Sequence, residues 1–342
     1  MSAPDESKNT GLQVGRAVAA LGVAYFHSYI ALRYFQPESI HPFAPLAEAG
    51  FFGVDFFFAI SGYVISVVTD RPSFSAGSFL VKRVFRLYPL VIVFCLFQYW
   101  LHIVPILDVT LDHSWQRILY GMSLLPGSGE RYYAVTWTLE HEVIFYLLAA
   151  MAVPRLGRMG LAGILALLVA ITYFFQPAFG SIHIFTMVHA DFLAGLLAYQ
   201  FRERLERLGS LMPALGSLAL YWLGYRGFFQ FAVACASFMA LVAFMNIRWD
   251  VKRFPLRLAV ILGDASYSIY MSHWILLYLS HWLAHDLEVD RSIAELWRFG
   301  TLGAICIVST ILWYGFEKPI NQFGHWLSRV KFTTATERQP RP

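Results

Sequence analysis

Ten apolar runs, each roughly 17 to 25 residues long, follow one another along this chain of 342 residues, and a helix of that length crosses the core of a bilayer. With 58% apolar and only 14% charged residues, the chain has too little polar surface for a soluble domain. The sequence therefore predicts an all-α, polytopic membrane helix bundle with about ten transmembrane helices. The expected spans are 12–35, 50–69, 84–106, 136–153, 159–175, 183–200, 210–225, 228–247, 258–283 and 297–317.

Basic residues are distributed unevenly between the loops that join these runs. If the N-terminus is cytoplasmic, twenty of the 26 Lys and Arg residues fall in cytoplasmic segments, as the positive-inside rule requires. Both termini are therefore expected in the cytoplasm. Anionic lipid facing these loops accounts for the net charge of +4, and no nucleic-acid partner is expected. We expect residues 1–11 to form a polar tail, 12–318 one transmembrane domain whose first helix is an uncleaved anchor, and 319–342 a basic tail.

Five titratable side chains on five predicted helices fall in the outer half of the membrane. Each costs about 2.5 to 3.5 kcal/mol at a helix centre, so such groups should face one another in a buried chamber rather than lipid. A histidine there can take a proton from a hydroxyl, and a carboxylate can orient it. Bridging between helices remains an alternative role for the aspartates. The five are His27, the candidate base, Asp55 and Glu142, the candidate orienting carboxylates, and Asp191 and His273.

A second, basic layer is predicted near the cytoplasmic surface. Arg83 and Arg86 are three residues apart, which puts two guanidiniums on one helix face and suits bidentate binding of phosphate. The alternative is a membrane anchor with snorkelling side chains, the interpretation preferred for Lys82. Arg16 shares this layer and lies eleven residues before His27, about 16 Å along a helix. A phosphate clamp below a buried histidine suggests a long, thin donor such as a coenzyme A thioester.

Six motifs follow one another in order along the chain. They are Arg16-x10-His27, GVDFFFAISGYVIS from Gly53 to Ser66, Arg83-Val84-Phe85-Arg86 before Leu-Tyr-Pro, Trp137-Thr138-Leu139 with Glu142 and Phe145-Tyr146, SYSIYMSHW from Ser266 to Trp274, and Glu317-Lys318-Pro319. Any one of them is a weak match, whereas six in register cover nearly the whole chain. Together they resemble the motifs of acyltransferase family 3, integral-membrane enzymes that O-acylate bacterial surface polysaccharides, lipopolysaccharide and nodulation factors.

The resemblance implies a ten-helix enzyme of the bacterial inner membrane that transfers an acyl group, by family default acetyl, from cytosolic acyl-CoA to a hydroxyl of a glycan or glycolipid. It implies that His27 is catalytic and that Arg16, Arg83 and Arg86 bind the donor. No metal is expected, nor the fused esterase-like domain of some relatives, and polysaccharide biosynthesis proteins are candidate partners. The residues expected to bind substrate are Ser61, Trp137, Tyr146, Tyr270 and His273.

Several alternatives remain open from the residues alone. A covalent acyl-enzyme on His27 or Ser61 is less favoured than direct transfer, because Gly62 beside Ser61 equally suits close helix packing. A proton-coupled transporter or a glycan export partner would also need buried ionisable groups, although neither broken helices nor internal repeats are evident. His281 and His285 have a spacing that permits metal binding, but they lie at a helix end where polar residues are expected.

Overall fold

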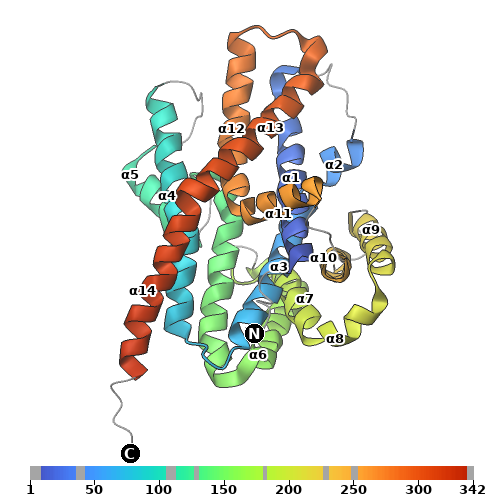
Figure 1. Ribbon diagram of the computed structural model, residues 1–342, viewed down its shortest axis with the longest axis vertical. Coiled ribbons are helices and arrows are strands. Elements are labelled where there is room, and N and C mark those ends of the chain that lie inside the picture. The colour runs from blue at the N-terminus through green and yellow to red at the C-terminus, as the bar shows by residue number, and fades with distance from the viewer. Residues whose placement is uncertain are drawn as a thin grey trace, which may run out of the picture.

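The computed structural model describes residues 9–35, 43–104, 113–126, 131–179, 183–225, 231–247 and 253–336, and these form helices and turns without a strand (Figure 1). The all-helical prediction is therefore confirmed. The α-helices are α1 (Thr10–Ala31), α2 (Ala44–Ala49), α3 (Phe52–Thr69), α4 (Ala76–Ile103), α5 (Trp115–Ser123), α6 (Trp137–Phe179), α7 (His189–Gln200), α8 (Arg202–Leu205), α9 (Leu211–Tyr225), α10 (Ala232–Asn246), α11 (Phe254–Asp264), α12 (Ser266–Asp286), α13 (Ala294–Leu312) and α14 (Lys318–Thr336).

Short 3-10 turns and one π-helical segment join or continue these helices. The 3-10 turns cover Arg33–Phe35, Ala134–Thr136, Glu206–Leu208 and Arg291–Ile293, and the π-helical segment, η6, covers Trp313–Glu317 between α13 and α14. Side-chain caps begin two of the longer helices. Asn9 accepts hydrogen bonds from the backbone N–H groups of Gly11 and Leu12 at the start of α1, and Ser75 accepts one from Ser78 at the start of α4.

Among the described residues, three helical segments are long and apolar enough to cross a membrane by length and composition: Phe52–Thr69, Ala134–Phe175 and Arg291–Val330. Within the described part of the chain, the helices Leu211–Gly224 and Ala232–Asn246 are apolar but shorter. These segments support a membrane protein. The count of ten spans and the cytoplasmic termini remain predictions.

Four of the predicted spans have different boundaries in the structure. The run 258–283 is divided at Ala265 into α11 and α12, and the run 183–200 becomes α-helical only at His189. The runs 136–153 and 159–175 both belong to α6, which kinks at Gly157. Gly157 has φ of 68°, a left-handed conformation that glycine adopts without a steric cost. This residue therefore turns the chain between two helical segments without a loop.

Helix α1 lies at the centre of the bundle and packs against α3, α10, α11 and α12. Helices α3 and α7 approach each other closely where two glycines meet. A Cβ atom built on Gly195 would lie 2.0 Å from the carbonyl oxygen of Ala59, and one built on Gly62 would lie 2.1 Å from that of Phe192. Small residues permit such close contact between helices in lipid. This contact explains Gly62, the neighbour of Ser61, as a packing residue.

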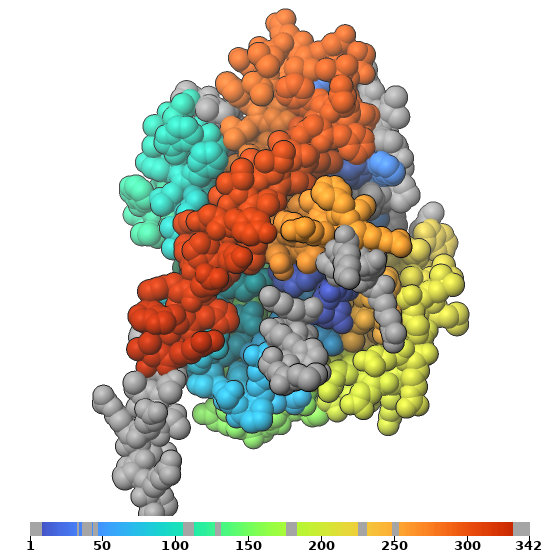
Figure 2. Space-filling view, viewed as in Figure 1, coloured from blue at the N-terminus to red at the C-terminus, as the bar shows by residue number. Residues whose placement is uncertain are grey.

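Residues 318–336 form a helix, α14, whereas the sequence predicts a tail from residue 319. Helix α14 runs along α4, and together with α13 it crosses one face of the molecule from its upper pole to its lower left edge (Figures 1 and 2). The ring of Phe323 lies edge-on to that of Phe85, and a Cβ atom on Gly324 would lie 2.5 Å from the Cβ of Phe85. Helix α14 is thus packed against α4 beside the two arginines of the basic layer.

Candidate active site

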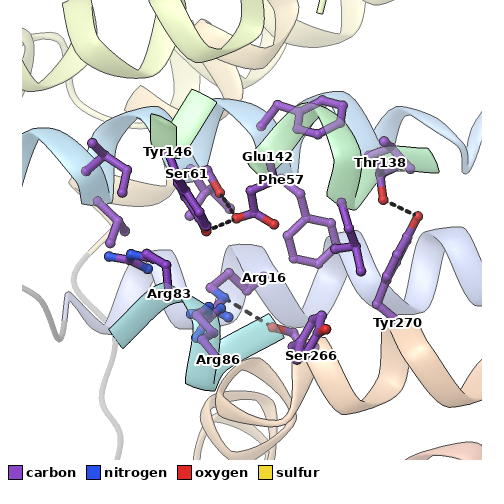
Figure 3. Close-up of a pocket in the computed structure, with 17 residues that line it drawn as sticks. Arg16, Phe57, Ser61, Arg83, Arg86, Thr138, Glu142, Tyr146, Ser266 and Tyr270 are labelled. Atoms are coloured by element: carbon purple, nitrogen blue, oxygen red, sulfur yellow. Dashed lines mark hydrogen bonds between the residues drawn. The ribbon is translucent and has the colours of Figure 1, made fainter. Parts of the chain in front are cut away.

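A central cavity of about 780 Å³ lies between α1, α3, α4, α6 and α12 (Figure 3). It is elongated, with guanidinium groups at one end and the hydroxyl of Tyr270 at the other. Six of the residues predicted from sequence to bind donor or substrate line it together with Glu142. They are Arg16, Ser61, Arg83, Arg86, Tyr146 and Tyr270.

The three arginines of the predicted basic layer meet at one end of the central cavity, although they come from two helices. Arg16 donates from Nε to Ser266 Oγ at 3.1 Å, which fixes its side chain against α12. The guanidinium of Arg83 lies 5.1 Å from the ring centre of Tyr146, and that of Arg86 lies 5.9 Å from the ring centre of Tyr267. Aromatic faces attract cations, so these rings hold the arginines without neutralising them. This end of the cavity is suited to bind an anion.

Glu142 lies among these arginines and not beside His27. Its Oε1 accepts a hydrogen bond from Ser61 Oγ at 2.9 Å and a second from the hydroxyl of Tyr146. The prediction that Glu142 shares a layer with His27 and orients it is therefore wrong in its geometry. The carboxylate instead offsets part of the positive charge in the cavity. The hydroxyl of Ser61 therefore acts as a hydrogen-bond donor to the carboxylate of Glu142 in this structure.

The opposite end of the central cavity is lined by aromatic and hydroxyl groups. Tyr270 Oη lies 2.8 Å from Thr138 Oγ1 and donates to the carbonyl of Val135 at 3.1 Å. The ring of Phe57 packs edge-on to Tyr270 (Figure 3). The ring of Tyr270 in turn lies 5.6 Å, centre to centre, from the imidazole of His273. One turn of α12 therefore leads from the cavity wall to the histidines.

His27 and His273 form a hydrogen-bonded pair beyond this end of the cavity. His273 is fully buried, and its Nδ1 lies 3.2 Å from the carbonyl oxygen of Ile269. A carbonyl only accepts, so Nδ1 of His273 carries the proton and its Nε2 carries the lone pair. His273 Nε2 lies 3.1 Å from His27 Nδ1, which must then be the donor. The hydrogen-bond network thus leaves Nε2 of His27 unprotonated and able to accept a proton.

Two other predicted residues lie away from the central cavity. Asp55 is on α3 but does not line it, and its carboxyl lies close enough to that of Asp191 on α7 for the two like charges to repel each other, so the bridging alternative stays a prediction. Asp55 therefore does not orient His27 in this structure. Trp137 has 42% of its surface exposed and its carbonyl accepts from His141 Nδ1 at 2.8 Å, so its indole faces outward from the cavity.

His281 and His285, whose spacing would permit metal binding, make contacts with a neighbouring tyrosine. His281 Nδ1 accepts a hydrogen bond from the backbone N–H of Tyr34 at 3.3 Å, and the ring of His285 packs edge-on against the ring of Tyr34. In the described ranges no group of three or more His, Cys, Asp or Glu residues gathers in a way that could hold a metal ion.

Sequence reasoning did not single out several residues that the structure brings to the site. Ser266 holds Arg16, Tyr267 packs under Arg86, and Thr138 hydrogen-bonds to Tyr270. Glu317, which the sequence presents as part of the Glu317-Lys318-Pro319 motif, accepts from Ser268 Oγ at 2.6 Å and interacts electrostatically with Arg16 and Arg86. All of these residues lie inside the motifs around Trp137, Ser266 and Glu317, which is the signal that could have found them, but a motif alone does not show which partner each side chain contacts.

Comparisons with known proteins find sequence matches over most of the chain. Residues 9–317 match the family described as Acyltransferase domain. The exopolysaccharide production protein ExoZ of Rhizobium meliloti (strain 1021) is 29% identical over 247 residues, which is 65% of this chain and 74% of that protein. ORF330 of Acidianus two-tailed virus, a protein proposed to be an acetyltransferase, is 24% identical over 284 residues, 75% of this chain and 80% of that protein. No solved structure matches.

Proposed function

Because this chain belongs to the acyltransferase domain family, we propose that it transfers an acyl group from acyl-CoA to a hydroxyl of a glycan or glycolipid, with His27 as the general base. The observation that carries this proposal is the polarity of the central cavity: three arginines at one end and a histidine pair beyond the other. That arrangement fits a donor with phosphates at one end and a thioester at the other.

The donor enters through the arginine end of the cavity in this proposal. Arg83 and Arg86 bind its diphosphate, because planar guanidiniums match phosphate oxygens bidentately. Arg16, held by Ser266, lies further along the same path. The pantetheine arm then follows the apolar wall formed by Phe57 and Tyr270 and brings the thioester towards His27. Both ends of the donor thereby contact protein groups of matching polarity.

The chemical step uses the unprotonated Nε2 of His27. As the acceptor hydroxyl attacks the thioester carbonyl carbon, its proton passes to Nε2 and a tetrahedral oxyanion forms. Collapse of this intermediate breaks the carbon–sulfur bond, and the departing sulfur takes the proton from His27. The products are a glycan ester and free CoA thiol. His273 supports the step because its Nε2 accepts from His27 Nδ1 and so keeps the imidazole in the required tautomer and orientation.

We propose the acceptor hydroxyl from the names of the relatives. The relative ExoZ is described by its role in exopolysaccharide production, so we propose a hydroxyl of an exopolysaccharide or of its lipid-linked precursor as the acceptor, and acetyl as the acyl group. The enzyme is proposed to act in the bacterial inner membrane with both termini in the cytoplasm, where CoA is available.

Purified protein tests this function directly. It is incubated with acetyl-CoA and exopolysaccharide or its lipid-linked repeat, and free thiol and glycan mass are recorded. We expect thiol release that depends on the acceptor, with one acetyl added to the glycan per thiol. Absence of thiol release with uptake of the glycan into proteoliposomes would contradict the proposal and favour a transporter.

A further inference from the structure

A second cavity of about 1020 Å³ adjoins the central cavity, and the two share Arg83 and Arg86 in their walls. We call it the basic cavity. It lies between the first turns of α4, η6 and α14, and its wall includes Lys82, Trp313, Asn321 and His325. The proposed path of the donor therefore continues from the arginines into a second compartment.

The basic cavity concentrates positive charge around Lys82. Burial, followed by the charges of Arg329, Arg71 and Arg83, lowers the pKa of Lys82. Among the described residues, Lys82, Arg83 and Arg329 form no ion pair with an acid. Cations held this close repel one another, and a bound polyanion would remove that cost.

One buried donor points to the same conclusion independently. Nε of Arg83 is buried and has no hydrogen-bond partner. A buried polar group without a partner costs free energy, so such groups in native proteins are regularly satisfied by something outside the chain itself. Arg83 lines both cavities, so an anion at their junction would supply the missing acceptor.

The walls of the basic cavity also offer surfaces for a purine ring. Trp313, placed by the π-helical segment η6, faces the cavity together with Phe74 and Phe79, and Asn321 provides an amide that can pair with a base edge. Aromatic side chains stack on purines, and π-helical segments frequently occur at functional sites. Basic groups, aromatic rings and an amide in one compartment are the recognition elements of a phosphorylated nucleoside.

We infer that the basic cavity binds the 3′-phosphoadenosine diphosphate part of CoA, with Lys82 on the 3′-phosphate and Arg83 and Arg86 on the diphosphate at the junction of the two cavities. This inference rests on the proposed acyl-CoA donor. The compact ammonium of Lys82 suits a single phosphate group, whereas the two guanidiniums suit the diphosphate. Helix α14, predicted from sequence as a tail, thereby becomes a wall of the donor site, and Lys82 has a role beyond anchoring.

A pair of ligands that differ only in one phosphate tests this assignment without turnover. CoA and 3′-dephospho-CoA are titrated calorimetrically into the full-length protein in detergent. We expect wild-type protein to bind CoA about tenfold more tightly, because a charge-assisted hydrogen bond is lost with the 3′-phosphate. In Lys82→Ala, CoA affinity should fall about tenfold while affinity for 3′-dephospho-CoA changes less than twofold. Lys82→Arg should keep most of the preference.

Arg155→Ala is the matched control, since it removes one exposed cation that lines neither cavity. It should bind both ligands as wild type does. Equal affinity of wild-type protein for the two ligands would overturn the inference and would favour an anionic lipid headgroup as the occupant. An equal loss of both affinities in Lys82→Ala would overturn it as well. Thiol release from acetyl-CoA by wild-type protein tests the proposed function separately, so the two can fail independently.

Discussion

His273 Nε2 lies 3.1 Å from His27 Nδ1, and this contact joins α12 to α1 across 246 positions of the sequence. The donor and the acceptor of this contact are fixed, because Nδ1 of His273 donates to the carbonyl oxygen of Ile269. His27 therefore donates and keeps its Nε2 lone pair. A second aromatic contact holds the ring in place, since Trp274 lies edge-on to His27 at 5.2 Å between ring centres. A half-buried imidazole with one fixed tautomer is the expected form of a general base.

Replacing His273 by phenylalanine should lower kcat about tenfold to a hundredfold and leave KM for acetyl-CoA unchanged. Phenylalanine keeps an aromatic ring but lacks the nitrogen that accepts the hydrogen bond from His27. His27 is then still present as the base, but its imidazole is no longer held in the productive orientation. Steady-state kinetics with varied acetyl-CoA separate the two constants. A rise in KM with constant kcat would show that His273 acts on donor binding instead.

Replacing Arg83 or Arg86 by lysine should raise KM for acetyl-CoA about tenfold or more, because lysine keeps the charge but not the bidentate fork. Turnover at saturating donor should fall much less. Arg155→Lys is the control, since Arg155 is exposed, hydrogen-bonds to the carbonyl of Met151 and lines neither cavity. Unchanged KM in both cavity variants would exclude these arginines from the donor site.

Glu142→Gln should strengthen binding of CoA by a few-fold, since it removes a negative charge from the cavity that is proposed to receive phosphates. Glutamine is isosteric, and its carbonyl oxygen can still accept from Ser61 and Tyr146. Calorimetric titration of CoA measures the effect. The opposite pattern, unchanged affinity with a large loss of kcat, would indicate that Glu142 acts on His27, as the sequence alone suggested.

Gly195→Ala should destabilise the protein by about 1 to 3 kcal/mol, because a Cβ atom there would lie 2.0 Å from the carbonyl oxygen of Ala59 and 2.6 Å from the amide nitrogen of Tyr63. Gly163→Ala is the matched control, since a Cβ atom on Gly163 meets no atom within 4 Å. Thermal unfolding in detergent should show a lower Tm for the first variant only. Equal Tm values for the two variants would mean that α3 and α7 are not in close contact.

Helical periodicity and charge predicted the basic layer well. Arg83 and Arg86 share a helix face because they are three residues apart. Arg16 was expected to lie near them, and all three arginines line the same cavity. His27 and His273 were expected at similar depth, and they do meet. These predictions depend on local spacing and on membrane depth, which a sequence contains.

The misplaced carboxylates show what depth counting omits. Gly53 at the start of α3 packs against Ala19 and Val23 of α1. Helix α3 therefore begins at the level of these two residues and not at the level of His27. Equal counts from helix ends therefore do not give equal depths, and Asp55 lies at least one turn away from His27 along the bundle axis. The surroundings of Glu142 differ from the prediction for another reason: the long side chains of the arginines in the basic layer extend as far as its carboxylate. Helix offsets and side-chain reach are tertiary properties that no single run of residues specifies.

The most direct measurement is acetyl transfer by His27→Ala, with CoA binding measured on the same preparation. Because His27 supplies only the base, we expect kcat to fall at least about a hundredfold while the affinity for CoA stays within twofold of wild type. Normal CoA affinity shows that the variant is folded. Acetyl transfer near the wild-type rate by a variant that binds CoA normally would contradict the assignment of His27 as the base.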